Sequence, residues 1–208
     1  MQRVHSIDFD VLAFTNFSQD HLDFHGTMEE YFAAKKTFIT EYPSESATII
    51  LNQDQEKIAS IPILKGRRES FGFHEDATWK LCSQELHLEG IQFSFELQSI
   101  EYSVSLPVVG AHNIENALVA ISSVYALGFS LQEIIKTLKS LPQAPGRLEK
   151  ISSKDGWHAF VDYAHTPDAL KKSLQTLRDL DPNKLIVVFG CGGDRDRHKR
   201  PIMGAIAD

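Results

Sequence analysis

The chain of 208 residues has 42% hydrophobic and 24% charged residues, an ordinary globular composition that allows one large domain or two small ones. Its 21 basic and 28 acidic side chains give a formal net charge of −7, which excludes a broad cationic surface for nucleic acid or for an anionic membrane. No segment resembles a signal peptide or reaches the roughly 18–20 apolar residues of a membrane span, so we expect a soluble cytoplasmic protein. Cys82 and Cys191 are too few for a disulfide framework or a zinc site.

The first fifty residues have a strand–helix–strand pattern. Residues 10–16 and 47–52 are short apolar runs that break into polar residues, as buried strands do when they reach a ligand-binding edge. Between them, Thr27 and Glu30 form a capping box that predicts a helix beginning at Thr27. This order favours a parallel sheet.

Residues 70–106 alternate between apolar and polar positions, which predicts a small antiparallel sheet. From Asn113 the apolar period becomes helical, with Gly128 ending one helix and Ser130 beginning the next. The stretch 141–146 is rich in proline and glycine, so we place a domain boundary there, between residues 1–144 and 145–208.

Beyond that boundary the pattern predicts the opening βαβ unit of a second α/β domain. It consists of a strand over 157–162, a helix from Pro167 to Leu180 with Thr166 near its cap, and a buried strand over 184–189. Another helix is expected from Pro201. Because no phosphate loop precedes the first strand and the pattern stops midway at Asp208, we expect both ends to be truncated.

The loop after the first strand carries Asp20, His21 and Asp23. Oxygen donors with one imidazole suit a divalent cation such as Mg²⁺ or Mn²⁺ that also binds phosphate. A solvated turn in which Asp20 caps the backbone and His21 packs explains the same residues.

In the following helix, Lys35 falls on the apolar face, seven residues after Met28 and four after Tyr31. A buried ammonium is costly, so such a lysine should be paired, neutral or chemically altered. Reaction of the neutral amine with CO₂ gives a carbamate, which is an oxygen ligand for a metal. The alternative is a lysine that extends from the edge of the face and keeps its amine in water.

Three further segments carry polar groups suited to nucleotide or carboxylate binding. Asn113 and Asn116 share a helix face and could read an adenine edge, although capping explains Asn113 equally well. Residues 162–168 pass from a strand end into a helix N-terminus, which favours anion binding.

The glycine-rich loop 190–201 is either an anion site with Arg195 as a carboxylate clamp or a solvated basic loop. Position 195 would need glycine in the dinucleotide fingerprint, so a nicotinamide cofactor is not expected.

Together these motifs resemble the Mur ligase family, and within it the UDP-N-acetylmuramoyl-tripeptide synthetase branch. They occur in family order over nearly the whole chain, and the last two blocks are specific to that branch. The segments that carry the resemblance are residues 14–26, 31–35, 112–118, 145–149, 161–170, 188–195 and 199–201.

The resemblance implies a fold and a set of catalytic residues. The fold would be a P-loop-like parallel-sheet ATPase domain that lacks its first part and carries a small antiparallel sheet, followed by the start of a Rossmann-like domain. His21 matches a Mg²⁺ ligand, and Lys35 matches a lysine that is carbamylated to hold the second of two Mg²⁺ ions. His165 would lie near the phosphates, and Arg195 would contact the carboxylate of the incoming diamino acid.

The resemblance also implies the nucleotide contacts. Asn113 and Asn116 match amides that contact adenine, Arg147 and Asp162 match positions at the nucleotide, and Thr166 would lie near the phosphates.

The implied reaction is ATP-dependent amide formation. ATP phosphorylates the D-glutamyl carboxylate of UDP-MurNAc-L-Ala-D-Glu, and the amine of a diamino acid, expected to be meso-diaminopimelate, displaces phosphate from the acyl phosphate. Small molecules would be the only partners of a monomeric protein. The alternatives are a ligase of the folylpolyglutamate synthase type and a non-catalytic α/β binding fragment. Without the phosphate loop, we expect the 208-residue polypeptide alone not to turn over ATP.

Overall fold

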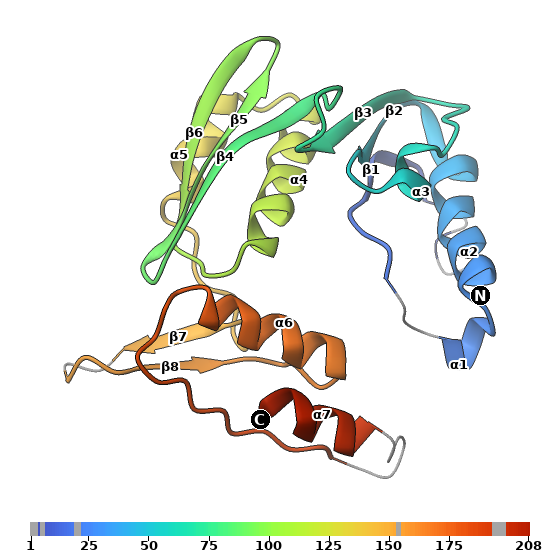
Figure 1. The fold of residues 1–208 in the computed structure, drawn as a ribbon. Helices are drawn as coiled ribbons and strands as arrows, with labels where there is room; N and C mark the ends of the chain where they lie inside the picture. Colours follow the sequence, from blue (N-terminus) through green and yellow to red (C-terminus); the bar gives the residue numbers. More distant parts are fainter. Residues whose placement is uncertain (1–3, 5–6, 19–21, 153–154, 193–198) are drawn as a thin grey trace. The chain divides into compact units, whose positions relative to one another are not determined.

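The computed structural model describes residues 4, 7–18, 22–152, 155–192 and 199–208 (Figure 1). The elements in chain order are β1 (Phe9–Phe14), α1 (Leu22–His25), α2 (Met28–Glu41), β2 (Pro43–Asn52), α3 (Glu56–Ala59), β3 (Arg67–Gly72), β4 (Trp79–His87), β5 (Gly90–Leu97), β6 (Ile100–Leu106), α4 (His112–Ala126), α5 (Leu131–Leu138), β7 (Glu149–Ser152), β8 (His158–Val161), α6 (Pro167–Arg178) and α7 (Lys199–Ala207). None of the helices in the described part of the chain is both long enough and apolar enough to cross a membrane.

A six-stranded sheet runs in the order β1-β2-β3-β4-β5-β6. The strands β1 to β4 are parallel, which confirms the predicted parallel sheet. Two residues join β4 to β5 and two join β5 to β6, and such short connections require antiparallel neighbours. Gln98 and Ser99 both have positive φ, 53° and 62°, as a tight hairpin turn requires. The predicted antiparallel strands are therefore present, but they continue the parallel sheet.

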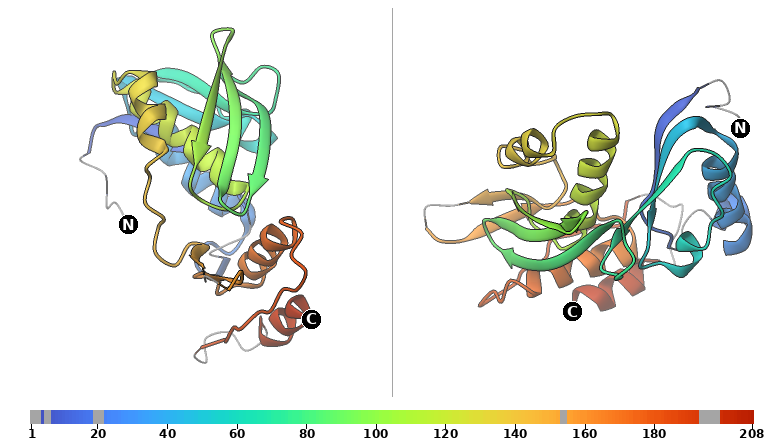
Figure 2. Two further views of the ribbon diagram at one scale, coloured as in Figure 1. Left: turned by 90° about the vertical axis from the view of Figure 1, so that its left-hand side faces the viewer. Right: turned by 90° about the horizontal axis from the view of Figure 1, so that it is seen from above.

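Residues 47–52 of β2 are buried on both faces of the sheet, which explains why this stretch is a nearly continuous apolar run and does not alternate. Its residues Ala47, Ile49 and Leu51 pack with Leu12 and with residues of α2 and α3 in one hydrophobic cluster. Figure 2 shows α2 and α3 beside the strands β1 to β3. This packing fixes the end of β1, and with it the start of the loop that the sequence predicts to be functional.

The helix α2 begins as its capping box predicts. Thr27 is its N-cap, and the Thr27 hydroxyl accepts a hydrogen bond from the backbone N–H of Glu30 at 3.2 Å. Tyr31 and Ile39 are buried on the face that packs against the sheet. Lys35 lies between these two positions, one helical turn from each.

The chain divides into two compact units. The first comprises Met1–Gln84, Phe93–Val104 and Ile114–Leu138, and the second comprises Glu85–Gln92, Ser105–Asn113 and Lys139–Asp208. In the second unit β7 pairs antiparallel with β8, and α6 and α7 pack around Leu170, Leu174 and Met203.

The prediction of a buried strand over residues 184–189 is wrong. These residues form no strand, and the side chains of Ile186 and Val188 are 71% and 94% exposed. The period-2 pattern is nevertheless real, because Leu185 and Val187 pack against the core of α6 and α7. A strand also needs a hydrogen-bonded neighbour, and in the described part of this unit β7 and β8 pair with each other. The predicted βαβ unit is therefore not formed.

Candidate functional site

Lys35 lines a pocket of about 430 Å³ together with Ala13, Phe14, Tyr31, Ala34, Phe38 and Ile39. Its amine lies 5.2 Å from the centroid of the Tyr31 ring and 5.8 Å from that of Phe14. The side chain is half-buried, so the ammonium is held by the negative faces of two rings and keeps only part of its hydration. The first unit thus places this lysine on an apolar helix face at the end of β1, as the sequence predicts.

The two interpretations of Lys35, a chemically altered lysine and a lysine that keeps its amine in water, predict different positions for the amine. A lysine that only reaches toward water would carry its amine away from the aromatic rings. The observed amine faces the pocket that the rings line, which leaves space beside it for added atoms. The amine therefore has space for a chemical role, and both that role and carbamylation stay predictions.

Two of the predicted site residues, His21 and Arg195, lie outside the described residues, as does Asp20. Over the described ranges, no group of three or more His, Cys, Asp or Glu side chains is arranged to hold a metal ion. The role of His21 as a metal ligand and that of Arg195 as a carboxylate clamp therefore stay predictions.

A polar brace that the sequence reasoning missed lies at the carboxyl edge of the parallel strands. Asn52, the last residue of β2, is 1% exposed, and its amide donates to the carbonyl of Thr15 at 2.8 Å and to the carboxylate of Glu115 at 3.4 Å. Its carbonyl oxygen accepts from the N–H of Asp54 at 2.9 Å. A buried amide at a strand end does signal that partners exist, but Thr15 and Glu115 are 37 and 63 residues away in sequence.

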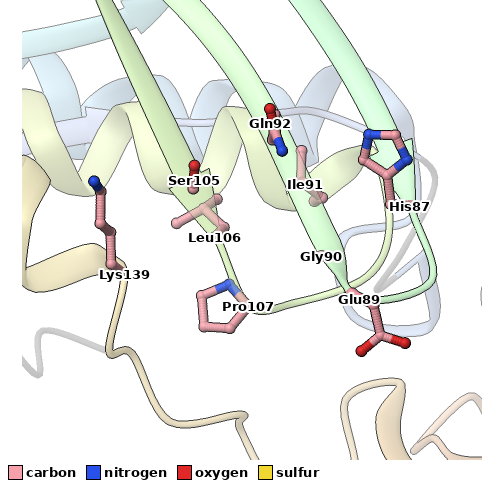
Figure 3. Close-up of a pocket in the computed structure, with 9 residues that line it drawn as sticks. All are labelled: His87, Glu89, Gly90, Ile91, Gln92, Ser105, Leu106, Pro107 and Lys139. Atoms are coloured by element: carbon pink, nitrogen blue, oxygen red, sulfur yellow. The ribbon is translucent and has the colours of Figure 1, made fainter.

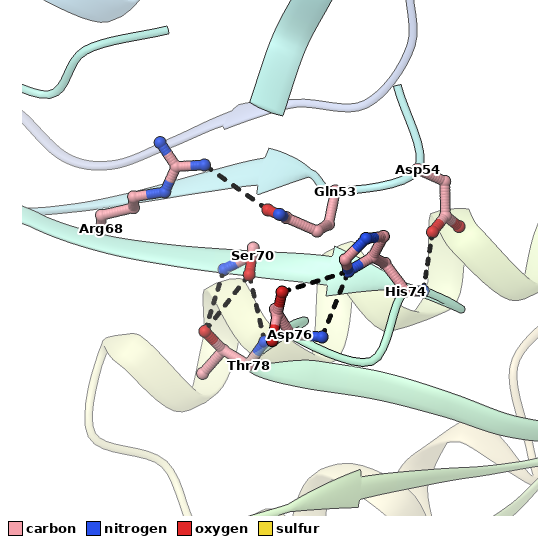
Figure 4. A network of polar contacts seen from close by, with 7 residues as sticks. All are labelled: Gln53, Asp54, Arg68, Ser70, His74, Asp76 and Thr78. Carbon is pink, nitrogen blue, oxygen red and sulfur yellow. Dashed lines mark hydrogen bonds and ion pairs between the residues drawn. The ribbon is translucent and has the colours of Figure 1, made fainter. Parts of the chain in front are cut away.

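Asp54 extends this brace to the third strand (Figure 4). Its carboxylate accepts from the backbone N–H groups of Phe73 and His74, each at 2.8 Å. Gly72 has φ +144, and a β-carbon there would come within 2.6 Å of that carboxylate, so glycine permits the close approach. The turn after β2 is therefore joined to the turn after β3.

Glu115, in the first turn of α4, is half-buried beside this turn. Burial raises the pKa of its carboxyl, and the neighbouring carboxylate of Asp54 raises it further. Both causes act against the charged form, because the site offers a carboxylate less hydration than water does and a like charge nearby.

This shift predicts a pH-dependent effect of Glu115→Gln on stability. Because the folded protein holds the Glu115 proton more tightly than the unfolded chain, stability should be lost as pH rises from the ordinary pKa of 4.5 through the raised value. Glutamine stays neutral, so the variant should gain stability over the parent as pH rises and show no such gain below that range. Thermal unfolding between pH 4 and 8 measures this, and parallel curves for the two proteins would contradict it.

Asn113 and Asn116 both lie near the start of α4, three residues apart, as predicted. The Asn113 amide donates to the carbonyl of Val109 at 2.8 Å, and its backbone N–H donates to Gly110 at 2.9 Å. An N-cap side chain accepts from a helix N–H, whereas this amide donates to a carbonyl, so the two roles that the sequence left open for Asn113 both stay predictions. Asn116 is exposed, and its role as an adenine contact stays a prediction.

The second unit brings together Arg147, Asp162, His165 and Thr166 around the loop between β8 and α6. Asp162 accepts from the N–H of Leu148 at 3.2 Å and from the hydroxyl of Ser173. Thr166 is the N-cap of α6, as predicted, and its hydroxyl accepts from the N–H of Ala169 at 3.2 Å.

The exposed ring of Tyr163 contacts both Arg147 and His165. The Arg147 guanidinium lies 5.7 Å from the Tyr163 ring centroid, and the His165 ring packs edge-on against Tyr163 at 5.0 Å. The backbone carbonyl of Tyr163 is 3.0 Å from Nδ1 of His165, which holds the imidazole in place. Asp162, Thr166, Arg147 and His165 are thus all positioned by contacts at one loop.

A second pocket, of about 640 Å³, lies at the base of the β4–β5–β6 hairpins (Figure 3). It is lined by His87, Glu89, Gly90, Ile91, Gln92, Ser105, Leu106, Pro107 and Lys139. Lys150, which donates to Glu89 at 2.7 Å and to the carbonyl of Leu88 at 3.1 Å, holds the turn between β4 and β5. None of the predicted site residues lines this pocket.

Curated proteins that are similar to this chain are named as ligases. It is 39% identical over 222 residues to the UDP-N-acetylmuramoyl-L-alanyl-D-glutamate–2,6-diaminopimelate ligase of Prochlorococcus marinus, and 40% identical over 212 residues to the ligase of the same name from Thermosynechococcus vestitus. Each match covers 99% of this chain and 43% or 42% of the relative. The chain therefore spans about two fifths of the length of the curated relatives that it matches.

Solved structures agree with these relatives. A structure of a UDP-N-acetylmuramoyl-L-alanyl-D-glutamate–2,6-diaminopimelate ligase matches with a TM-score of 0.74 at 33% identity, covering 99% of this chain and 43% of that one. A crystal structure of MurF from Acinetobacter baumannii matches with a TM-score of 0.72 at 26% identity, over 81% of this chain and 37% of that one.

Family comparison covers both parts of the chain. Residues 1–124 match the Mur ligase middle domain, and residues 146–208 match the Mur ligase glutamate ligase domain. The resemblance drawn from the sequence motifs is thereby confirmed: the chain belongs to the Mur ligase family.

Proposed function

We propose that the chain forms part of an ATP-dependent amide ligase that adds meso-diaminopimelate to UDP-MurNAc-L-Ala-D-Glu in peptidoglycan synthesis. The names of the relatives at 39% and 40% identity support the reaction and the substrates. ATP, the UDP-linked dipeptide and the diamino acid would be its small-molecule partners, met by a monomer in the cytoplasm. The two family matches leave residues 125–145 between them, which supports our placement of the domain boundary between residues 144 and 145.

The observation that carries this proposal is the position of Lys35 within the stretch that matches the middle domain. Its half-buried amine faces a pocket of about 430 Å³ and lies over the rings of Phe14 and Tyr31. A carbamate adds three heavy atoms to the amine, and this pocket has room for them. The donor chemistry therefore fits magnesium, provided that Lys35 is carbamylated and His21 supplies an imidazole.

Magnesium held by His21 and carbamylated Lys35 would neutralise the charge between ATP and the substrate carboxylate. The chain's own residues would do the rest by positioning. Asn116 and Asn113 would contact adenine, and Arg147 with Asp162 would hold the nucleotide.

The polar groups at the start of α6, in the second unit, would bind phosphate. Thr166 and His165 lie at the N-terminus of this helix, where its dipole favours an anion, so we assign them to the phosphates. Arg195 would clamp the diaminopimelate carboxylate with its planar guanidinium. Holding the amine against the acyl phosphate supplies the entropic part of the catalysis.

A chimera tests the proposed function. Residues 1–208 replace the matched segment of the Thermosynechococcus vestitus relative, so that the rest of a ligase is supplied by that protein. ADP release and the mass of the product are measured with the UDP-linked dipeptide and diaminopimelate, and each substrate is omitted in turn. We expect ADP release that requires all three substrates, together with the amide product.

The unaltered relative serves as the positive control, and circular dichroism with thermal unfolding establishes that the chimera is folded. A folded chimera that forms no amide while the relative does so would refute the proposed function for these residues.

A further inference from the structure

The strongest remaining feature is Asn52, a buried side chain at the end of β2 that none of the predicted roles uses. It contacts three separate segments of the first unit: the carbonyl of Thr15 after β1, the carboxylate of Glu115 in α4, and the N–H of Asp54 in its own turn. A primary amide has two N–H donors and a carbonyl acceptor. Each of these three groups has a partner here, so the orientation of the amide is fixed.

A second contact from the same turn reinforces the first. The backbone N–H of Phe17 donates to the side-chain carbonyl of Gln55 at 3.0 Å. Residues 15–17 are therefore held at two points, by Asn52 and by Gln55. This segment continues in sequence to His21, the predicted metal ligand.

The contact with Glu115 reaches the other predicted part of the site. Glu115 precedes Asn116 directly in the first turn of α4, the helix that carries the predicted adenine contacts. A shift of the Asn52 side chain would therefore move residues 15–17, which precede the predicted metal ligand in sequence. It would also move the first turn of α4, which precedes the predicted adenine contact Asn116.

We propose that Asn52 is a positioning residue of the nucleotide site, which fixes residues 15–17 relative to the first turn of α4 through one amide. The proposal rests on the proposed function, because it assigns Asn52 to the same site. Asn52 touches no substrate in this role and acts through Thr15 and Glu115. Groups that orient the ligands of a metal site typically change its affinity or activity about 10–100-fold when they are removed.

A purely structural role would give a different result, because many buried amides only satisfy neighbouring backbone groups. Ser94 is a matched control: it is 5% exposed, lies in β5 of the same sheet, and shares a 2.7 Å hydrogen bond with Ser83. The variants Asn52→Ala and Ser94→Ala each remove a buried hydrogen-bonding side chain. Only the first should affect the predicted site.

The first test uses the 208-residue chain and needs no activity. Amide hydrogen exchange is followed by NMR at Phe17 and Asn116, which Asn52 does not contact directly, in the parent and in both variants. We expect Asn52→Ala to accelerate exchange at both amides by about tenfold or more relative to Ser94→Ala, because local opening there becomes less costly. Equal exchange in the two variants at matched global stability would overturn the proposal, whatever the chimera does.

The second test uses the chimera and separates the contact of Asn52 with Glu115 from its contact with Thr15. Asn52→Asp places a carboxylate opposite Glu115 and opposite the Thr15 carbonyl, so we expect about 10–100-fold higher KM for ATP and a similarly raised Mg²⁺ requirement. Adding Glu115→Gln lets the glutamine amide donate to the introduced carboxylate, while the Thr15 carbonyl still lacks a donor. The double variant should therefore recover its KM for ATP and keep the raised Mg²⁺ requirement.

The outcomes distinguish the two proposals. A folded chimera without activity refutes the proposed function, and the exchange measurement then decides only whether Asn52 couples residues 15–17 to α4. An active chimera in which Asn52→Asp behaves like Ser94→Ala, or in which Glu115→Gln restores nothing, overturns the positioning role alone.

Discussion

Replacing Lys35 by alanine in the chimera should lower the rate of amide formation by about a thousandfold. The reason is electrostatic: a metal ligand that helps to neutralise two anions contributes several kcal/mol to the transition state, and about 1.4 kcal/mol corresponds to a tenfold change in rate. ADP release and product mass measure the effect. We expect acetate to restore part of the activity, because a small carboxylate can enter through the pocket of about 430 Å³ and occupy the space that the lysine side chain vacates.

Lys36→Ala is the matched control for this prediction. Lys36 is the adjacent residue of α2, and its side chain does not line the pocket that Lys35 lines. Its removal should leave the rate within about twofold of the parent, since surface substitutions away from a site have small effects. Similar losses in both variants, or no loss in either, would show that the pocket beside Lys35 has no special role.

Replacing Trp79 by alanine should destabilise the first unit by about 3–5 kcal/mol, the usual cost of truncating a large buried aromatic side chain. Trp79 is fully buried at the start of β4, and its ring contacts those of Phe95 and Tyr125 at centroid distances of 5.7 and 5.4 Å. Urea unfolding followed by circular dichroism gives the free energy of unfolding. The ring joins β4, β5 and α4, so the loss should appear as lower stability of the whole unit.

Trp79→Phe separates packing from hydrogen bonding at the same position. The indole N–H donates to Glu69 at 2.6 Å, and that carboxylate is buried and paired with Arg67 at 2.7 Å. Phenylalanine keeps much of the ring contact and removes the donor, so we expect a loss of about 1–3 kcal/mol. If the two variants lost equal stability, packing of the indole ring would not be the main contribution.

Local signals predicted the elements that local interactions determine. The capping box at Thr27, the proline at the start of α6 and Thr166 before it fixed two helix starts, and the structure has both caps. The apolar runs of β1 and β2, with a helix between them, were enough to predict parallel strands, because a strand–helix–strand order favours a parallel sheet. Lys35 was likewise placed by helical spacing alone.

Interactions that depend on distant partners were harder to predict. Residues 184–189 have strand periodicity, yet they form no strand, because periodicity indicates which side chains are buried and not whether a neighbouring strand supplies hydrogen bonds. The contacts of Asn52 with Thr15 and Glu115 span 37 and 63 residues, so no short motif contains them. The likeness to a family supplied the reaction class that we propose, whereas the physical chemistry of the residues alone left Lys35, His21 and Arg195 with two readings each.

The most direct test of the central claim is ¹³C NMR of the chimera in ¹³C-bicarbonate with Mg²⁺ and a non-hydrolysable ATP analogue. We predict a carbamate signal that disappears in Lys35→Ala and persists in Lys36→Ala. A chimera that forms the amide product but shows no carbamate signal dependent on Lys35 would contradict the claim that this lysine becomes a magnesium ligand.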